Sequence, residues 1–162
     1  MTPAEPTRTT ARARRLGFDG DDGDLRWPAE LAAPAGGGIV GVGVDAIEIA
    51  RVEAAVRRTP ALLARIWTVK ERARCTSRCG DLRVGGLAGR FAAKEAVAKA
   101  LGSGVVGFGF VDVEIVNDHT GRPSVRLHGG AADRAAALGV ADVALSLSTT
   151  ADLALAYAVA HR

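Results

Sequence analysis

The order of apolar and polar positions divides the start of the folded region into a strand and a helix. Residues 39–44 form an unbroken apolar run that stops at Asp45, and such a run is typical of a strand buried on both faces. Apolar residues then recur at helical spacing from Ile47 to Val56, while arginines occupy the other face. Pro60 marks the end of this predicted helix.

Two further helices are indicated by the residues at their ends. Thr68 and Glu71 have the spacing of a capping box, in which each side chain satisfies a backbone N–H of the first helical turn. We expect this helix to continue to about Cys75. The alanine-rich stretch at 87–101 predicts a longer helix, and Gly102 follows it where a glycine commonly ends one.

The second half of the chain has the two-residue period of β-strands. Alternation begins near Val111, and "NDHTGRP" supplies the residues of a tight turn, so a β-hairpin is expected. The later segments are expected to be a strand at 124–128, a helix at 130–139 and strands at 142–148 and 152–160. Because strands and helices are mixed without regular alternation, we predict an α+β domain with a mostly antiparallel sheet packed with helices.

Length and composition narrow the class of protein. The 162 residues suit one domain with a tail; we expect a weakly ordered N-terminal extension at 1–37 and the folded domain at 38–162. Only 4% of the residues are aromatic, which argues against base-stacking surfaces and hence against a nucleic-acid partner. No apolar run reaches the roughly 18 residues that span a bilayer, and no secretory signal is present. We therefore expect a cytoplasmic protein without a membrane partner.

Net charge and cysteine content say less about the class of protein than length and composition do. The net charge of +3 and the sequence pI near 9.3 favour acidic partners. Cys75 and Cys79 are four residues apart, and no nearby histidine supplies the rest of a zinc site. We interpret both as reduced structural thiols, as is usual in cytosolic proteins.

The candidate chemistry centres on a carboxylate in the alanine-rich helix. Glu95 must be paired, protonated or bound to a cation, because a bare buried charge is costly. One explanation is an ion pair with Lys99, four residues on. The other takes in Asp45, at the end of the apolar strand: two carboxylates suit Mg²⁺, which fills its shell with waters and phosphate oxygens. Lys94 and Lys99 then supply positive charge for the same phosphates.

These residues also carry a family resemblance. The segments "GIVGVGVDAIEIARVE", "IWTVKE", "RFAAKEAVAKALGSG", "VDVEIVNDHTGRPSV" and "VALSLS" resemble, in order, those of holo-acyl-carrier-protein synthases, the short 4'-phosphopantetheinyl transferases. The resemblance covers about residues 38–160. It implies an enzyme that transfers the 4'-phosphopantetheine arm of coenzyme A to a serine of an apo acyl-carrier protein and releases adenosine 3',5'-bisphosphate. It also implies a homotrimer with sites at the subunit boundaries.

The resemblance assigns roles to individual positions. It makes Asp45 and Glu95 the Mg²⁺ ligands and catalytic residues, and it leaves Lys94 either to hold phosphate or to help deprotonate the serine. Coenzyme A binding falls to Lys99, Arg90, Gly102 and Ser148. Carrier-protein binding falls to Arg51, Arg57 and Arg58 on the first helix. The general base remains open between a metal-bound water and a carboxylate near Asp45 and Glu95.

One departure from the family pattern keeps a second interpretation open. Ala144 and Thr149 stand where the family usually has histidines, and a threonine hydroxyl cannot take up a proton near neutral pH as imidazole does. The histidines that are present, His119, His128 and His161, are interpreted as structural or solvated. The alternative function is a catalytically impaired relative that still binds carrier protein.

Overall fold

The computed structural model describes residues 38–102 and 107–162. The extension expected at 1–37 lies outside the described residues. The strands are β1 (Ile39–Glu48), β2 (Val113–Asn117), β3 (Pro123–Leu127), β4 (Asp142–Thr149) and β5 (Leu153–His161). The helices are α2 (Ile49–Arg58), α3 (Leu62–Ile66), α4 (Val69–Arg74), α5 (Val84–Ala100) and α6 (Gly129–Leu138), with a 3-10 turn, η2, at Phe110–Asp112.

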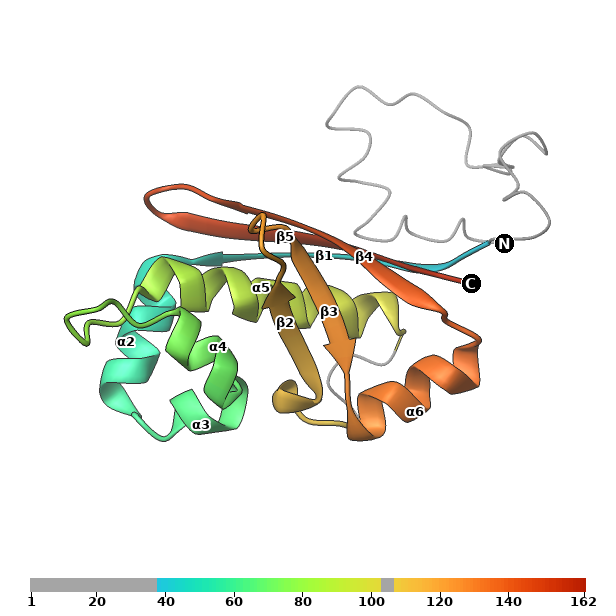
Figure 1. The fold of residues 1–162 in the computed structure, drawn as a ribbon, viewed down its shortest axis with the longest axis horizontal. Helices are drawn as coiled ribbons and strands as arrows, with labels where there is room; N and C mark the ends of the chain where they lie inside the picture. The colour runs from blue at the N-terminus through green and yellow to red at the C-terminus, as the bar shows by residue number, and fades with distance from the viewer. Residues whose placement is uncertain (1–37, 103–106) are drawn as a thin grey trace, which may run out of the picture. The chain divides into compact units, whose positions relative to one another are not determined.

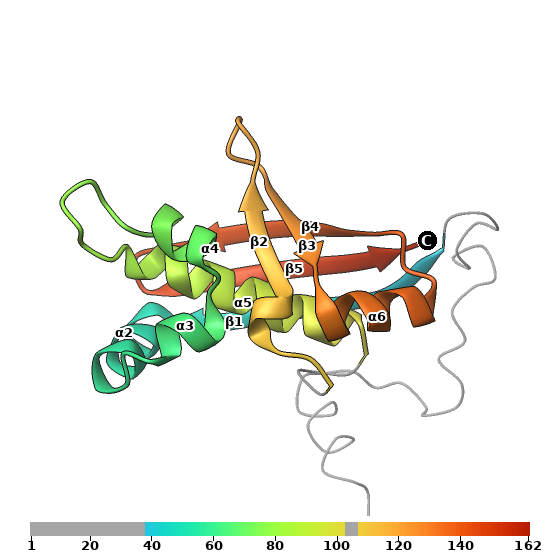
Figure 2. The same cartoon turned by 60° about the horizontal axis from the view of Figure 1, so that its bottom comes forward.

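The strands form two antiparallel sheets, a three-stranded one in the order β1-β5-β4 and the hairpin β2-β3. The long helix α5 lies along one face of the larger sheet, and the hairpin crosses the other side of α5 (Figures 1 and 2). Helices α2, α3 and α4 gather near one end of α5 and α6 near the other (Figure 1). The predicted α+β fold with antiparallel pairing is confirmed.

Small residues let α5 approach the sheet closely. The inward positions of β5 are the fully buried alanines 154, 156, 158 and 160. On β1, a Cβ added at Gly41 would lie 2.0 Å from the Ala100 carbonyl oxygen, and one at Gly43 would lie 1.9 Å from that of Ala96. Only glycine fits so near a helix backbone. Asp45 is two residues further along the same face, so this close approach brings its carboxylate to α5.

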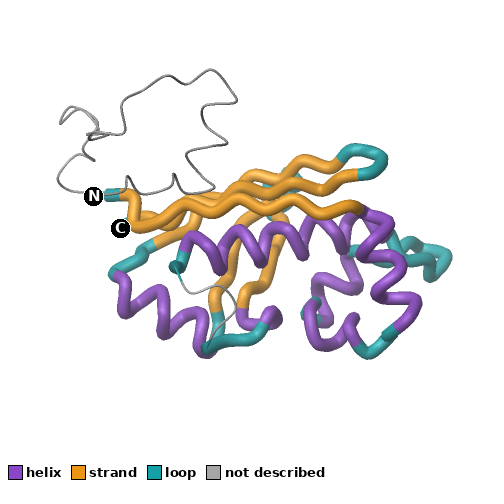
Figure 3. The backbone as a smooth tube through the Cα atoms, turned by 180° about the vertical axis from the view of Figure 1, so that it is seen from behind, coloured by secondary structure: helices purple, strands orange, loops and turns teal. Residues whose placement is uncertain are grey.

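No helix or strand among the described residues covers the outer face of the larger sheet (Figure 3). Several large apolar side chains are exposed on this face. Val44 is 52% exposed and Tyr157 44%, and the two are directly paired across β1 and β5. Val42 and Leu155 are exposed on the same face. The prediction that β1 is buried on both faces is therefore wrong for the single chain: its unbroken apolar run combines a core face with an exposed apolar face.

Locally encoded features formed as expected. Thr68 and Glu71 make the predicted capping box at the start of α4. Helix α5 ends just before Gly102, which has φ +72°. The hairpin turn and the helix before Gly139 are also confirmed. None of the helices in the described part of the chain is long and apolar enough to cross a membrane.

Three expectations need correction. Strand β1 continues past Asp45 to Glu48, so α2 begins two residues after Ile47. Helix α3 was not anticipated, because five residues carry too little pattern. Strand β2 begins at Val113 because the residues before it form η2.

Candidate active site

A cation and a carboxylate meet where α5 crosses β1. The Lys99 Nζ donates to the Asp45 Oδ1 at 2.8 Å and to the Val44 carbonyl oxygen at 2.9 Å. The Lys99 side chain is 48% exposed and that of Asp45 19%. The ion pair within the helix between Glu95 and Lys99, considered from their spacing, does not form; Lys99 pairs with the strand instead.

Glu95 lies beside this pair without its own counter-ion. Burial raises the pKa of the Glu95 carboxyl, the charge on Asp45 raises it further, and Lys99 offsets only part of the effect. Two carboxylates therefore share one ammonium group. This local excess of negative charge, at a position open to solvent, is a setting that an added divalent cation would stabilise.

The donor set fits Mg²⁺ in composition and is incomplete without a substrate. Among the described residues, no three His, Cys, Asp or Glu side chains are grouped to hold a metal. Mg²⁺, however, is usually bound through one or two carboxylates, with waters and substrate phosphates completing its octahedron. Asp45 and Glu95 meet that requirement in number and in ligand type.

Lys94 belongs to a different cluster, on the face of α5 that packs against α4 and β2. Its Nζ donates to the Glu71 Oε2 at 2.8 Å and to the carbonyl oxygens of Phe110 and Val113 at 2.9 and 2.5 Å. Both charged side chains of this pair are 0% exposed. All three protons of the ammonium are used in these contacts, which gives Lys94 a structural role. The part expected of Lys94 in holding phosphate or deprotonating the serine stays a prediction.

Glu71, the partner of Lys94, makes more contacts than the capping box predicted from the sequence. Its Oε1 accepts from the backbone N–H of Ile115 at 3.0 Å. Its Oε2 accepts from the Lys94 Nζ and, as part of the capping box, from the Thr68 backbone N–H. One carboxylate thus joins α4, α5 and β2. The capping-box spacing was the available signal, and nothing local in the sequence points to contacts 23 and 44 residues away.

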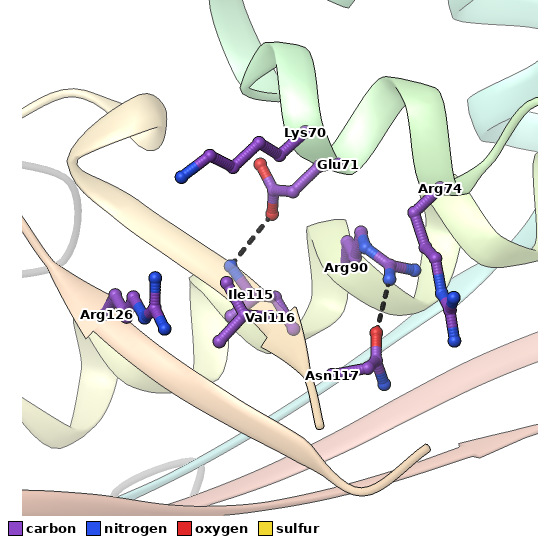
Figure 4. A pocket seen from close by; sticks show the side chains of 8 residues that line it. All are labelled: Lys70, Glu71, Arg74, Arg90, Ile115, Val116, Asn117 and Arg126. Atoms are coloured by element: carbon purple, nitrogen blue, oxygen red, sulfur yellow. Dashed lines mark hydrogen bonds between the residues drawn. The ribbon is translucent and has the colours of Figure 1, made fainter. Parts of the chain in front are cut away.

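The residues expected to bind coenzyme A do not all gather around Asp45 in one chain. Gly102 follows Lys99 at the end of α5 and donates its N–H to the Lys99 carbonyl oxygen. Ser148 is exposed opposite Leu155, on the outer face of the larger sheet. Arg90 lines a cavity of about 290 Å³ between α4, α5 and the hairpin (Figure 4).

The two positions that depart from the family pattern lie on opposite faces of β4. Thr149 faces inward, where its side chain lies near Gly85 and Gly89 of α5. Ala144 is exposed and pairs with Val159. Neither supplies a titratable group.

The arginines expected to bind carrier protein are exposed on α2, which follows β1 directly. Arg51, Arg57 and Arg58 are all solvent-accessible, and Arg57 makes an exposed ion pair with Glu53 at 2.8 Å. The direct connection from β1 places this basic helix a few residues beyond Asp45 in the chain.

Together these features define an α+β domain with a paired-carboxylate, lysine-containing site suited to phosphate chemistry. The sequence profile of the 4'-phosphopantetheinyl transferase superfamily matches residues 41–158, and the chain belongs to this superfamily of transferases.

Individual relatives agree. The chain is 47% identical over 130 residues to a holo-[acyl-carrier-protein] synthase of Chloroflexus aurantiacus, covering 73% of this chain and 95% of that protein. It is 44% identical over 121 residues to the synthase of Clostridium novyi, covering 75% and 86%.

Solved structures share the fold. The Neisseria meningitidis holo-[acyl-carrier-protein] synthase aligns with a TM-score of 0.69 at 33% identity, covering 76% of this chain and 98% of that one. The Helicobacter pylori synthase in complex with coenzyme A aligns with a TM-score of 0.64 at 28% identity, covering 74% and 98%.

Proposed function

We propose that this chain transfers the 4'-phosphopantetheine arm of coenzyme A to a serine of an apo acyl-carrier protein, releasing adenosine 3',5'-bisphosphate. The observation that supports this location of the active site is that the side chains of Asp45, Glu95 and Lys99 lie close together. Membership of the transferase superfamily and the similarity to named holo-[acyl-carrier-protein] synthases support the reaction.

The residues act on the pyrophosphate of coenzyme A. Asp45 and Glu95 would hold Mg²⁺, which supplies neutralisation of the negative charge on the pyrophosphate oxygens. Lys99 is exposed enough to turn its ammonium toward the same phosphates. The serine oxygen forms a bond to the β-phosphorus as the bond from that phosphorus to the bridging oxygen breaks, and the electron pair leaves with adenosine 3',5'-bisphosphate. The hydroxyl proton passes to an acceptor within hydrogen-bond reach.

The carrier protein would bind at α2. Arg51, Arg57 and Arg58 present positive charge on one exposed helix, and acidic side chains of a carrier protein would complement it. Because α2 begins four residues after Asp45, a carrier bound there would present its serine near the carboxylates.

We further infer that the enzyme is a homotrimer in which other copies of the chain cover the outer face of the larger sheet. Val42, Val44, Leu155 and Tyr157 would otherwise leave an apolar surface in water. Ser148 lies on this same face. Its assignment to coenzyme A binding therefore fits a site shared between copies better than a site within one chain.

An intact-mass assay tests the reaction. Purified protein is incubated with coenzyme A, Mg²⁺ and a panel of apo carrier proteins, and the intact mass of each carrier is measured by mass spectrometry. We expect a mass gain of one phosphopantetheine that Asp45→Ala and Glu95→Gln abolish. Asp133→Asn, which alters an exposed acid on α6, is the matched control and should keep activity. Carrier binding without modification would instead establish the impaired relative suggested by Ala144 and Thr149.

The oligomer is tested separately by light scattering after size exclusion. Tyr157→Asp places a charge in the centre of the apolar face and should shift the mass from trimer to monomer. Asp142→Ala, an exposed position at the start of β4, should leave the mass unchanged. A monomeric parent protein would overturn the trimer.

A further inference from the structure

Arg134 of α6 reaches the end of the helix that carries Glu95 and Lys99. Its Nε donates to the Leu101 carbonyl oxygen at 3.1 Å. Leu101 is the C-cap residue of α5 and is fully buried, so its carbonyl oxygen has no access to water. Among the described residues, Arg134 supplies the hydrogen bond that this oxygen would otherwise lack. The guanidinium also places positive charge at the negative end of the helix dipole.

The rest of the Arg134 guanidinium lies beside Gly102. Gly102 follows α5 with φ +72°, and a Cβ added there would lie 3.7 Å from the Arg134 Nη2. Within residues 38–102 and 107–162, the Arg134 side chain makes no ion pair and no hydrogen bond other than that to Leu101. Its polar contact is therefore committed to the end of α5.

Helix α6 is anchored at its first turn to the segment around η2. The His128 backbone N–H donates to the Asp112 carbonyl oxygen at 2.8 Å. A Cβ added at Gly130 would lie 2.6 Å from the Gly107 carbonyl oxygen, so the two backbones are in close contact. Arg134 lies one turn further along α6, and it connects this anchored helix to the end of α5.

Lys99 lies on the turn that Arg134 holds. It is two residues before Leu101, and Gly102 donates its N–H back to the Lys99 carbonyl oxygen at 3.0 Å. The same turn sets the direction from which the Lys99 Nζ reaches Asp45. Binding groups that are misplaced by about 1 Å lose much of their effect, so a contact that fixes this turn also fixes the position of the Lys99 ammonium.

We propose that Arg134 is a positioning residue, which holds the last turn of α5 so that Lys99 meets the phosphates of coenzyme A. The identity of this ligand rests on the proposed function, whereas the contact between α6 and α5 does not. Glu95 lies six residues before Leu101 on α5, away from the turn that Arg134 holds. Mg²⁺ should therefore bind with similar affinity whether or not Arg134 is present.

The first experiment measures the turn itself and needs no coenzyme A. Amide hydrogen exchange is followed by NMR in the isotope-labelled full chain, at the backbone N–H groups of Leu101 and Gly102. Both groups donate to carbonyl oxygens of the last turn of α5. Arg134→Ala should speed their exchange about tenfold, the effect of losing one hydrogen bond, and leave exchange at Ala93 in the middle of the helix unchanged. Arg134→Lys can still donate to the Leu101 carbonyl oxygen and should restore part of the protection.

Arg162→Ala is the matched control. The Arg162 Nε would lie 3.5 Å from a Cβ added at Gly139, which follows α6 as Gly102 follows α5, so this variant removes an arginine from the end of the other helix. It should exchange at Leu101 and Gly102 as the parent does. Parent-like exchange in Arg134→Ala would overturn the proposal, as would equal acceleration in both variants.

The second experiment links the turn to coenzyme A through steady-state kinetics. Arg134→Ala should raise the KM for coenzyme A about threefold to tenfold with little change in kcat or in the KM for carrier protein, and Arg134→Lys should recover part of the loss. A role in overall stability alone would lower the active fraction, and hence kcat, without changing KM.

A double variant tests whether Arg134 acts through Lys99. In a Lys99→Met background, Arg134→Ala should raise the KM for coenzyme A no further, because both changes remove one contact. Additive effects, or a fall in kcat with an unchanged KM, would overturn the proposal. If the parent transfers nothing, calorimetric titration of coenzyme A gives the same comparison as a Kd, so failure of the reaction and failure of this proposal are distinguishable.

Discussion

Two lysines on α5 make ion pairs of the same length in opposite surroundings. Lys94 and Glu71 are 2.8 Å apart with both side chains 0% exposed, whereas Lys99 and Asp45 are 2.8 Å apart with 48% and 19% exposed. The buried lysine has all its donors committed to protein atoms, and these contacts hold elements together. We propose that the exposed lysine releases Asp45 to a metal and turns to a phosphate. Accessibility, not distance, would then separate the structural pair from the functional one.

The buried pair should show the largest effect on stability. Lys94→Met leaves the Glu71 carboxylate uncompensated in the core, and we expect the free energy of unfolding to fall by about 3–5 kcal/mol. Lys99→Met removes the same charge from the exposed pair and should cost less than about 1 kcal/mol. Urea denaturation of both variants measures the difference.

A double variant tests whether the stability lost in Lys94→Met comes from the unpaired charge of Glu71. Adding Glu71→Gln to Lys94→Met removes the stranded charge, and it should recover part of the lost stability because the two sites are coupled. Equal losses for Lys94→Met and Lys99→Met would contradict the assignment of Lys94 to a structural role.

Close packing of β1 on α5 supports the exposed pair, so Gly43→Ala should have the next largest effect. The added Cβ would lie 1.9 Å from the Ala96 carbonyl oxygen, and strand and helix must separate to admit it. We expect a loss of about 1–3 kcal/mol together with weaker Mg²⁺ binding, because Asp45 follows on the same strand.

Gly109→Ala is the control for this substitution. Gly109 has φ −94° and only ordinary contacts for an added Cβ, at 3.8 and 3.9 Å. It should change neither thermal stability nor calorimetric Mg²⁺ binding by much. A Gly43→Ala protein that melts with the parent would show that the helix and strand are not in such close contact.

Glu95 should make the free energy of unfolding depend on pH. Burial and the Asp45 charge raise the pKa of Glu95, so the native state holds this proton more tightly than the unfolded chain does. The free energy of unfolding should therefore fall as pH rises through the interval above the ordinary pKa of a glutamate. Glu95→Gln removes this fall and should be more stable at high pH by less than about 1 kcal/mol, since the group is partly solvated.

With Mg²⁺ present, the parent protein should become more stable than Glu95→Gln at high pH, the reverse of the order expected without the ion. The ion needs the ionised carboxylate, so its affinity should rise with pH through the same interval, and at high pH it should stabilise the parent but not Glu95→Gln. Thermal melts at several pH values, with and without Mg²⁺, measure both effects. Equal stabilisation of the two proteins would exclude Glu95 as a ligand.

The sequence predicted those parts of the molecule whose signals are local. The capping box of Thr68 and Glu71 satisfies N–H groups within one turn, and the glycines at 102 and 139 adopt the positive φ that ends a helix. The pairing of Asp45 with Glu95 followed from two acids in apolar surroundings and from the family resemblance, and their roles as ligands stay predictions. Lys94 was grouped with them because it is adjacent to Glu95, although neighbours on a helix point about 100° apart.

The sequence could not show which neighbouring element each side chain contacts. The contact of Lys94 with Glu71 spans 23 residues and that of Lys99 with Asp45 spans 54. The apolar run of β1 gave no sign that one of its faces is exposed in the single chain, because exposure depends on whether another copy covers it. The cavity lined by Lys70, Arg74, Arg90 and Arg126 likewise combines residues from α4, α5 and β3, which are far apart in the sequence.

The exposed ion pair on α2 should give the smallest effect on stability and so sets the lower end of the comparison. Arg57 and Glu53 are 75% and 51% exposed, and Arg57→Ala should change the free energy of unfolding by less than about 0.5 kcal/mol. If α2 binds the carrier protein, the same variant should raise the KM for carrier a few-fold without changing kcat, with a weaker dependence on salt. Arg65→Ala on α3 should not do so. Steady-state kinetics at two ionic strengths would decide: an unchanged KM for carrier in Arg57→Ala would remove this arginine from the docking surface.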